Sequence, residues 1–315
     1  MRCHVTAKEE KKFLPENNIC PMAGTEWRKK LKIAFWSNLR GQCGVTTNLA
    51  CMAAMSAISG IGKCILLENH YNLNSLGNIL LPPERVAILK EKGQYYNKYG
   101  IEYLLKRLYT GESGEALIHK ASVPLLYSSI LYLPQSYIVN REVFNYEFEL
   151  VRSELFRCLE EVSELVYIDT EANRNISSNA ILQEADLIVV NLYQDQFVWR
   201  EFFDNYPSIR DKCIFLIGKY QPDWKYNLIR IRREFQIPRN RIGAIPYNME
   251  LQSAMNEGRT LQFLNRNYLK TSQPDNEILM KELKRSAGML RENVLQIRRE
   301  KRRMLNSSVQ QNYNR

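Results

Sequence analysis

Short, mostly apolar runs alternate with helical stretches along most of this chain, and this alternation restricts its fold more than any other feature. The runs are KIAFWS, KCILLE, ILYLP, LVYIDT, ADLIVVNL, CIFLIGK and RIGAIPY. Continuous apolar strands of this length are typical of parallel sheets that are buried on both faces. Helices between the runs, with few hairpin signals, indicate right-handed βαβ units. We therefore predict an α/β fold with a doubly wound, mostly parallel sheet.

The 315 residues divide into one domain and two flanking segments. Residues 1–30 are polar and without periodicity, which is typical of a loosely ordered tail. Residues 31–292 carry the alternating pattern and are predicted to form a single domain. Residues 293–315 are predicted to form a basic helical extension with a disordered end.

Composition excludes several classes of protein. No apolar run approaches the roughly 18 to 20 residues of a membrane span, and the polar N-terminus lacks the apolar segment of a secretion signal. The three histidines and seven cysteines are scattered without a CxxC pair, so we expect neither a zinc site nor an iron–sulfur cluster. The chain is predicted to act in the cytoplasm.

The stretch SNLRGQCGVTTNLA, residues 37–50, joins the first apolar run to a helical one. A phosphate-binding loop in this place directs backbone N–H groups and a helix N-terminus at phosphates, with a lysine and a hydroxyl group assisting. Glycines and paired threonines suit that chemistry, but Val45 stands at the lysine position. Taken alone, the stretch is either a phosphate loop or a structural strand–helix turn.

Ligands of doubly wound sheets lie beyond the carboxyl ends of the strands. The segments predicted to line such a site are residues 37–47, 68–74, 169–174, 218–220 and 245–248. We therefore expect any ligand to contact these segments.

Seven landmarks along the chain follow the order found in the ParA/MinD family of P-loop ATPases. The loop resembles the family's KGGxGKTT sequence, ILLENHYNLNSLGNIL its strand ending in Asp-x-Asp, and LVYIDTEANRN its DYVIIDTPAG segment. GIEYLLKRLYTGESGEALIH with LYLPQ, EADLIVVNLYQD, LIGKYQPD and IGAIPYNMELQSAMNEGRTL resemble the remaining segments. The resemblance covers residues 32 to about 292. It implies a P-loop NTPase fold, ATP and Mg²⁺ as ligands, and a homodimer formed through the nucleotide face.

The resemblance also implies roles for individual residues. Arg40 stands at the family's signature lysine, which reaches the partner subunit's nucleotide. Thr46 and Asp169 stand at the positions that hold magnesium, and Lys219 lies in an adenine-side segment. The predicted nucleotide site comprises Arg40, Gly41, Gln42, Cys43, Gly44, Val45, Thr46, Thr47, Lys219 and Pro246.

Two departures from the family bear on catalysis. Val45 removes a charge aimed at the phosphates, and losing one preorganised donor costs about 100- to 1,000-fold in rate. His70 replaces an aspartate that in the family helps to position the attacking water, while Glu68 keeps an acid. We therefore predict an ATPase by descent that binds ATP and magnesium weakly and hydrolyses little or none. No residue is assigned a catalytic role, although Asp169 and His70 stand at switch positions.

Simpler interpretations stay open for the same residues. Asp169 and Glu68 could cap the segments that follow their strands, and Lys219 could be a solvated loop charge. The loop itself could be vestigial and kept only for folding. Each of these would leave the fold intact without a ligand.

Functions of two classes compete. The missing lysine beside a preserved helix-rich body most resembles the TadZ/CpaE branch, whose members localise pilus and secretion machinery. This favours a scaffold that positions a pilus, secretion or conjugation apparatus. The alternative is a DNA-partitioning ATPase of the ParA type, which needs hydrolysis to reset its binding to non-specific DNA. An iron–sulfur carrier ATPase of related fold is disfavoured because a CxxC pair is missing.

Positive charge gathers near the C-terminus. The net charge is +10, and residues 281–303 hold nine basic against three acidic residues. Within them, VLQIRREKRRML sets a thin apolar face among cations. Such a helix could rest on the inner face of an anionic membrane or bind DNA, or it could be a solvated tail. Charge alone does not choose between these partners.

Overall fold

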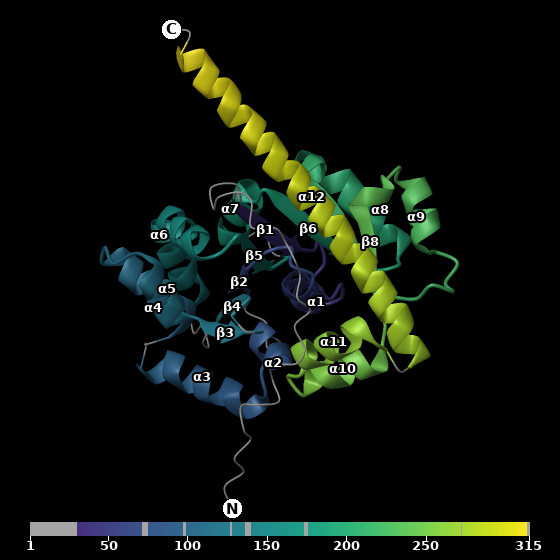
Figure 1. The fold of residues 1–315 in the computed structure, drawn as a ribbon, viewed down its shortest axis with the longest axis horizontal. Coiled ribbons are helices and arrows are strands. Elements are labelled where there is room, and N and C mark those ends of the chain that lie inside the picture. Colours follow the sequence, from purple (N-terminus) through teal and green to yellow (C-terminus); the bar gives the residue numbers. More distant parts are fainter. Residues whose placement is uncertain are drawn as a thin grey trace, which may run out of the picture.

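The computed structural model contains one sheet whose strand order is β3-β4-β2-β5-β1-β6-β7-β8. It describes residues 30–70, 75–96, 99–126, 128–135, 140–172, 176–271 and 273–313. The predicted N-terminal tail lies outside these ranges except for residue 30. Figure 1 shows the sheet with helices on both sides.

The strands are β1 (Leu31–Trp36), β2 (Cys64–Asn69), β3 (Val123–Leu125), β4 (Ile130–Leu133), β5 (Leu165–Thr170), β6 (Leu187–Leu192), β7 (Cys213–Tyr220) and β8 (Ile242–Pro246). The α-helices are α1 (Val45–Ile58), α2 (Leu76–Leu80), α3 (Pro83–Tyr96), α4 (Gly100–Tyr109), α5 (Glu115–Ala121), α6 (Arg141–Val162), α7 (Ile176–Glu184), α8 (Gln196–Asn205), α9 (Leu228–Glu234), α10 (Met249–Asn256), α11 (Thr260–Leu269) and α12 (Pro274–Tyr313). Two short 3-10 helices, η3 (Pro207–Lys212) and η4 (Arg239–Arg241), precede β7 and β8.

Seven of the eight strands run parallel, which confirms the predicted α/β fold with a mostly parallel sheet. The exception is β3, which pairs antiparallel with β4 and was not predicted. Asp169 of β5 is in register with Phe35 of β1 and with Glu68 of β2. The parallel register therefore brings the carboxyl ends of these three strands to one edge of the sheet.

Side chains of the sheet fill two apolar layers. Ile33 and Phe35 of β1 pack with α1, α2, α10, α11 and α12, while Ala34 and Trp36 pack with the helices from α4 to α9. This alternation follows from the two-residue period of a strand. Both faces of the central strands are buried, which explains why their sequences are apolar at nearly every position.

Helix α12 runs unbroken through the expected division between residues 292 and 293 and continues to Tyr313. It therefore includes most of the end that was expected to be disordered. The reason is local, because residues 302–313 contain no glycine or proline to stop a helix. Figure 1 shows α12 crossing the domain and projecting beyond it. Among the described residues, no helix is both long and apolar enough to cross a membrane.

Helix α12 also covers the edge of the sheet at β8. The buried Ser286 Oγ accepts a hydrogen bond from the Ala244 N–H at 3.0 Å and donates one to the Ala244 carbonyl at 3.0 Å. An unpaired edge strand exposes such groups to other chains. One hydroxyl group therefore satisfies both backbone groups of Ala244.

We expect Ser286→Ala to lower the free energy of unfolding by about 1–3 kcal/mol, because it leaves buried backbone groups without partners. Urea denaturation measures the change. The matched control is Ser253→Ala on α10, where the serine is exposed. An equal effect of the two substitutions would contradict this role for Ser286.

Candidate functional site

The loop between β1 and α1 turns at two glycines. Gly41 has φ +76° and Gly44 has φ +68°, a left-handed conformation that favours glycine. Gly44 is the N-cap of α1, and no side chain caps this helix end. Val45, Thr46 and Thr47 then form its first turn. A helix N-terminus that follows such a loop is the arrangement that binds anions.

The side-chain amides of two buried asparagines fix the position of this loop. Asn48 of α1 donates to the Cys43 carbonyl at 3.4 Å and to Asn191 Oδ1 at 2.8 Å, and Asn191 donates to the Trp36 carbonyl at 3.2 Å. The loop is thereby tied to β1 and β6. Burial raises the pKa of the Cys43 thiol, so this side chain stays neutral.

Two predicted nucleotide-site residues, Lys219 and Pro246, lie at the ends of the neighbouring strands β7 and β8. A Cβ at Gly218 of β7 would lie 2.6 Å from the Cys43 carbonyl oxygen, so this strand approaches the loop backbone closely. Lys219 follows with φ +50°. Pro246 at the end of β8 is in register with Tyr220. Lys219 therefore lies on the strand that approaches the loop, and Pro246 lies at the end of the next strand.

A cavity of about 560 Å³ opens beside Thr46 and Thr47. Its other walls include Asn78 of α2 and Gln252 and Asn256 of α10. Small-molecule sites usually measure about 300–1,000 Å³. The first turn of α1 therefore borders a space large enough for a small ligand.

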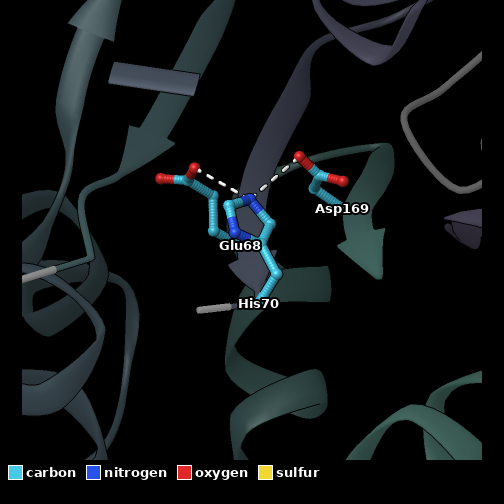
Figure 2. Close-up of side chains that lie close together, drawn as sticks. All are labelled: Glu68, His70 and Asp169. Atoms are coloured by element: carbon cyan, nitrogen blue, oxygen red, sulfur yellow. Dashed lines mark hydrogen bonds and ion pairs between the residues drawn. The ribbon is translucent and has the colours of Figure 1, made fainter. Parts of the chain in front are cut away.

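Three buried titratable side chains meet at the ends of β2 and β5. His70 Nε2 lies 3.1 Å from Asp169 Oδ2 and 3.3 Å from Glu68 Oε1. Figure 2 shows the imidazole ring between the two carboxylates. All three residues are at most 3% exposed. The sequence placed His70 and Asp169 at switch positions, and the structure pairs them directly.

Two further hydrogen bonds fix the position of Glu68. The Leu76 N–H donates to its Oε1 at 2.6 Å, and the Tyr132 hydroxyl donates to its Oε2 at 2.6 Å. Burial, followed by the charge of Glu68, raises the pKa of Tyr132 well above its usual range. Tyr132 therefore stays a donor, and Glu68 keeps its orientation toward the imidazole.

The charge of His70 follows from these neighbours. Burial alone would lower its pKa, but the carboxylates of Asp169 and Glu68 outweigh that effect and raise the pKa to about 11. At neutral pH the ring is therefore an imidazolium that donates toward Asp169. We call Glu68, His70 and Asp169 the buried ion triad. Its cation is the imidazolium of His70, so the chain itself supplies the positive charge between the two carboxylates.

The buried ion triad also offers one nitrogen and two oxygen atoms that lie within 4.8 Å of one another. An imidazole with carboxylates suits transition metals, whereas magnesium prefers oxygen ligands and water. Asp169 Oδ2, the group predicted to serve a magnesium ion, is already paired with His70. Asp169, in this pairing, therefore does not fit the role predicted for it in the magnesium site.

A second ion cluster lies at the same edge of the sheet. Arg40 of the loop is 3.7 Å from Oε1 of the buried Glu171, and Arg141 donates to both oxygens of that carboxylate at 2.9 and 2.8 Å. Glu171 lies within the predicted segment 169–174 but was given no role of its own, and Arg141 lies outside every predicted segment. The end of a predicted strand marked the segment of Glu171, whereas nothing near Arg141 in the chain marks that residue. The predicted segments 71–74 and 173–174 lie outside the described residues.

No protein-family model matches this sequence, and no curated protein matches it either. Several solved structures are similar in fold. A ParA family ATPase from Chlorobium tepidum TLS is 13% identical, with a TM-score of 0.56 over 82% of this chain and 98% of that chain. The cell division ATPase MinD of Pyrococcus furiosus is 10% identical, with a TM-score of 0.58 over 83% and 98%.

A third similar structure is a plasmid partition protein from Borrelia burgdorferi B31 bound to AMPPNP. It is 16% identical, with a TM-score of 0.54 over 87% of this chain and 99% of that chain. Identities this low show the fold alone. The chain therefore has the single-domain α/β fold of the MinD/ParA P-loop NTPases.

We expect His70→Gln to lower the free energy of unfolding at pH 7 by about 3 kcal/mol, because it leaves two buried carboxylates without their cation. The pH dependence should also change. The pKa of His70 is higher in the folded chain, about 11, than its ordinary value of 6.5. The stability it contributes is therefore complete below pH 6.5 and is lost as the pH rises toward 11.

Chemical denaturation between pH 6 and pH 10 tests this expectation. The difference in unfolding free energy between the wild type and His70→Gln should shrink steadily as the pH rises. His119→Gln is the control, since His119 is an exposed histidine paired with Glu115. A difference that is constant with pH would contradict an imidazolium at position 70.

Proposed function

We propose that this chain is a ParA/MinD-like P-loop protein that binds ATP weakly, hydrolyses little or none of it, and acts as a scaffold that positions a pilus, secretion or conjugation apparatus. The buried ion triad is the observation that carries this proposal. Its cation stands where an ATPase of this fold would use acidic side chains. A protein that cannot complete the reaction is suited to holding a position rather than to cycling.

The argument against hydrolysis is electrostatic. Phosphoryl transfer depends on positioning and on charges that neutralise the transferred group. Val45 supplies no charge at the first turn of α1. His70 forms an ion pair with Asp169 and adds a positive charge beside it. This charge disfavours the binding of a divalent cation at Asp169. Both losses act on the chemical step.

The features that remain at this site support weak nucleotide binding. The glycine turns and the uncapped start of α1 persist, and the cavity beside Thr46 is large enough for a small ligand. Arg40 adds a cation at the loop. The similar partition protein was solved with AMPPNP bound, which supports a nucleotide as the ligand class.

The remaining parts of the proposal rest on resemblance. The lost lysine beside a preserved fold favours the TadZ/CpaE branch with its degenerate Walker A loop. We propose a homodimer formed through the nucleotide face, located in the cytoplasm or at the inner face of the membrane. Partners would be components of the apparatus that the scaffold positions.

The basic part of α12 supports a second candidate, a DNA-partitioning protein of the ParA type. A groove of about 340 Å³ lies between α12 and the turn that follows α1, and its lining includes Arg291, Arg298, Arg299 and Arg302. Arginines in a row suit the phosphates of a DNA backbone without reading its sequence. This candidate requires hydrolysis to reset binding, which the buried ion triad disfavours.

Isothermal titration with ATP and magnesium tests the site. We expect weak heats at about millimolar ATP for the wild type, and roughly tenfold tighter binding for Val45→Lys, because a new cation contacts phosphate. Val45→Met matches the length without the charge and should leave the affinity unchanged. Adding His70→Asp to Val45→Lys should make binding depend on magnesium.

Steady-state assays should find no turnover in the wild type. Heats that are absent for both the wild type and Val45→Lys would contradict the assignment of this loop to phosphates. Appreciable wild-type hydrolysis would contradict the scaffold.

A gel-shift series with random-sequence DNA separates the two candidates. For a scaffold we expect weak binding that is lost between about 50 and 200 mM salt. Arg299→Gln with Arg302→Gln should weaken even that binding, whereas Arg259→Gln, at an exposed ion pair elsewhere, should not. Tight binding that depends on ATP would favour DNA partition instead.

A further inference from the structure

The carboxylate of Glu171 gathers two arginines at the entrance to the phosphate loop. Arg141 Nη2 lies 2.9 Å from Oε1 and 2.8 Å from Oε2. Arg40 Nη2 lies 3.7 Å from the same Oε1. Two guanidinium groups therefore converge on one oxygen atom, one from the loop and one from a helix that begins more than a hundred residues later.

The anion and its two cations differ in their exposure to solvent. The Glu171 side chain is fully buried, whereas the side chains of Arg40 and Arg141 are 56% and 40% exposed. The carboxylate is therefore covered by protein, and the guanidinium groups form the layer between it and solvent. An anion that arrives from solvent meets the arginines first.

This cluster adjoins the loop that lacks its lysine, because Arg40 belongs to that loop. Arg40 directly precedes Gly41 in the loop, and Arg141 is the first residue of α6, whose N-cap Asn140 accepts from two N–H groups. The Glu171 N–H donates to the Asn69 carbonyl at 3.2 Å, which fixes the acid at the ends of β2 and β5. The cluster thus stands at the ligand edge of the sheet.

We propose that Arg40 and Arg141 form a binding site for the terminal phosphates of a nucleotide, and that Glu171 is a built-in competitor that keeps this site weak. The nucleotide part of this inference rests on the proposed function. A guanidinium group has five N–H donors in a planar fork. Each arginine can therefore keep Glu171 on one side and donate to phosphate on the other.

Glu171 acts on the phosphates in two ways. Its charge repels a phosphate group held by the same arginines, at a distance where like charges still interact. It also uses some of the donors that phosphate would take. Replacing the carboxylate with the isosteric amide removes the charge and keeps the shape, so phosphate affinity should rise.

The competing interpretation is purely structural. In that case Arg141 serves only to neutralise a buried carboxylate, and its removal would cost stability without changing phosphate affinity. The two interpretations differ in what happens at Glu171. Only the phosphate site predicts tighter binding when the charge of Glu171 is removed.

Isothermal titration with inorganic tripolyphosphate and, separately, with ATP tests the proposal at constant ionic strength. Arg141→Gln should weaken tripolyphosphate binding about tenfold, and Arg141→Lys should weaken it less because the charge remains. Glu171→Gln should tighten it roughly threefold to tenfold. Circular dichroism confirms that each variant is folded.

Matched controls lie on the same helix. Arg157 pairs with Glu154 and Glu161, its side chain is 51% exposed, and it lies roughly 24 Å along α6 from Arg141. Arg157→Gln and Glu161→Gln change the same charges away from the loop. Both should leave tripolyphosphate affinity unchanged.

The outcomes separate this proposal from the proposed function. If tripolyphosphate follows the expected pattern while ATP does not bind, the arginine site stands and the nucleotide part of the function fails. If Arg141→Gln behaves like Arg157→Gln, or folded Glu171→Gln like Glu161→Gln, the arginine site is overturned. If Glu171→Gln does not fold, the comparison of Arg141→Gln, Arg141→Lys and Arg157→Gln decides.

Discussion

Charge balance at the carboxyl edge of the sheet is the constraint on which this site depends. Glu68, Asp169 and Glu171 are each at most 2% exposed, and a buried carboxylate without a cation destabilises a fold by several kcal/mol. The chain provides the cations itself. His70 lies between two of these acids, and Arg141, with Arg40 nearby, pairs with the third. The site is thus neutralised before any ligand arrives.

Under the proposed function, this internal balance would explain how a phosphate loop persists with little or no catalysis. A site that depends on an external metal ion and on phosphates gains stability when they bind, and that gain drives its cycle. Here the stabilising cation is covalently part of the chain and cannot leave. Binding of a nucleotide would then change the charge balance of the site little. Hydrolysis would in turn have only a small change to reverse. A charge state that does not change with the nucleotide would follow, and this is the property that the proposed scaffold requires.

The sheet could be predicted from the sequence because burial on both faces forces nearly every strand residue to be apolar. The strand β3 could not, since it has three residues, contains a proline and pairs at an edge. The end of α12 was misjudged because its polarity is also typical of disorder, although nothing in residues 302–313 stops a helix. Local sequence patterns predict buried strands well. They predict the structure of segments with few tertiary contacts poorly.

The residues of the candidate site likewise fall into those that the sequence could identify and those that it could not. The loop glycines and threonines are neighbours in the chain and could be identified together, whereas Arg141 and Glu171 are thirty residues apart and meet only because α6 returns to β5. The support of the loop by Asn48 and Asn191 likewise appears only in three dimensions. These amides tie the turn to β1 and β6 through hydrogen bonds that involve no ligand. Its glycines and the start of α1 have the geometry that phosphate binding requires. Under our proposal, the arginines beside the loop determine how strongly phosphate binds.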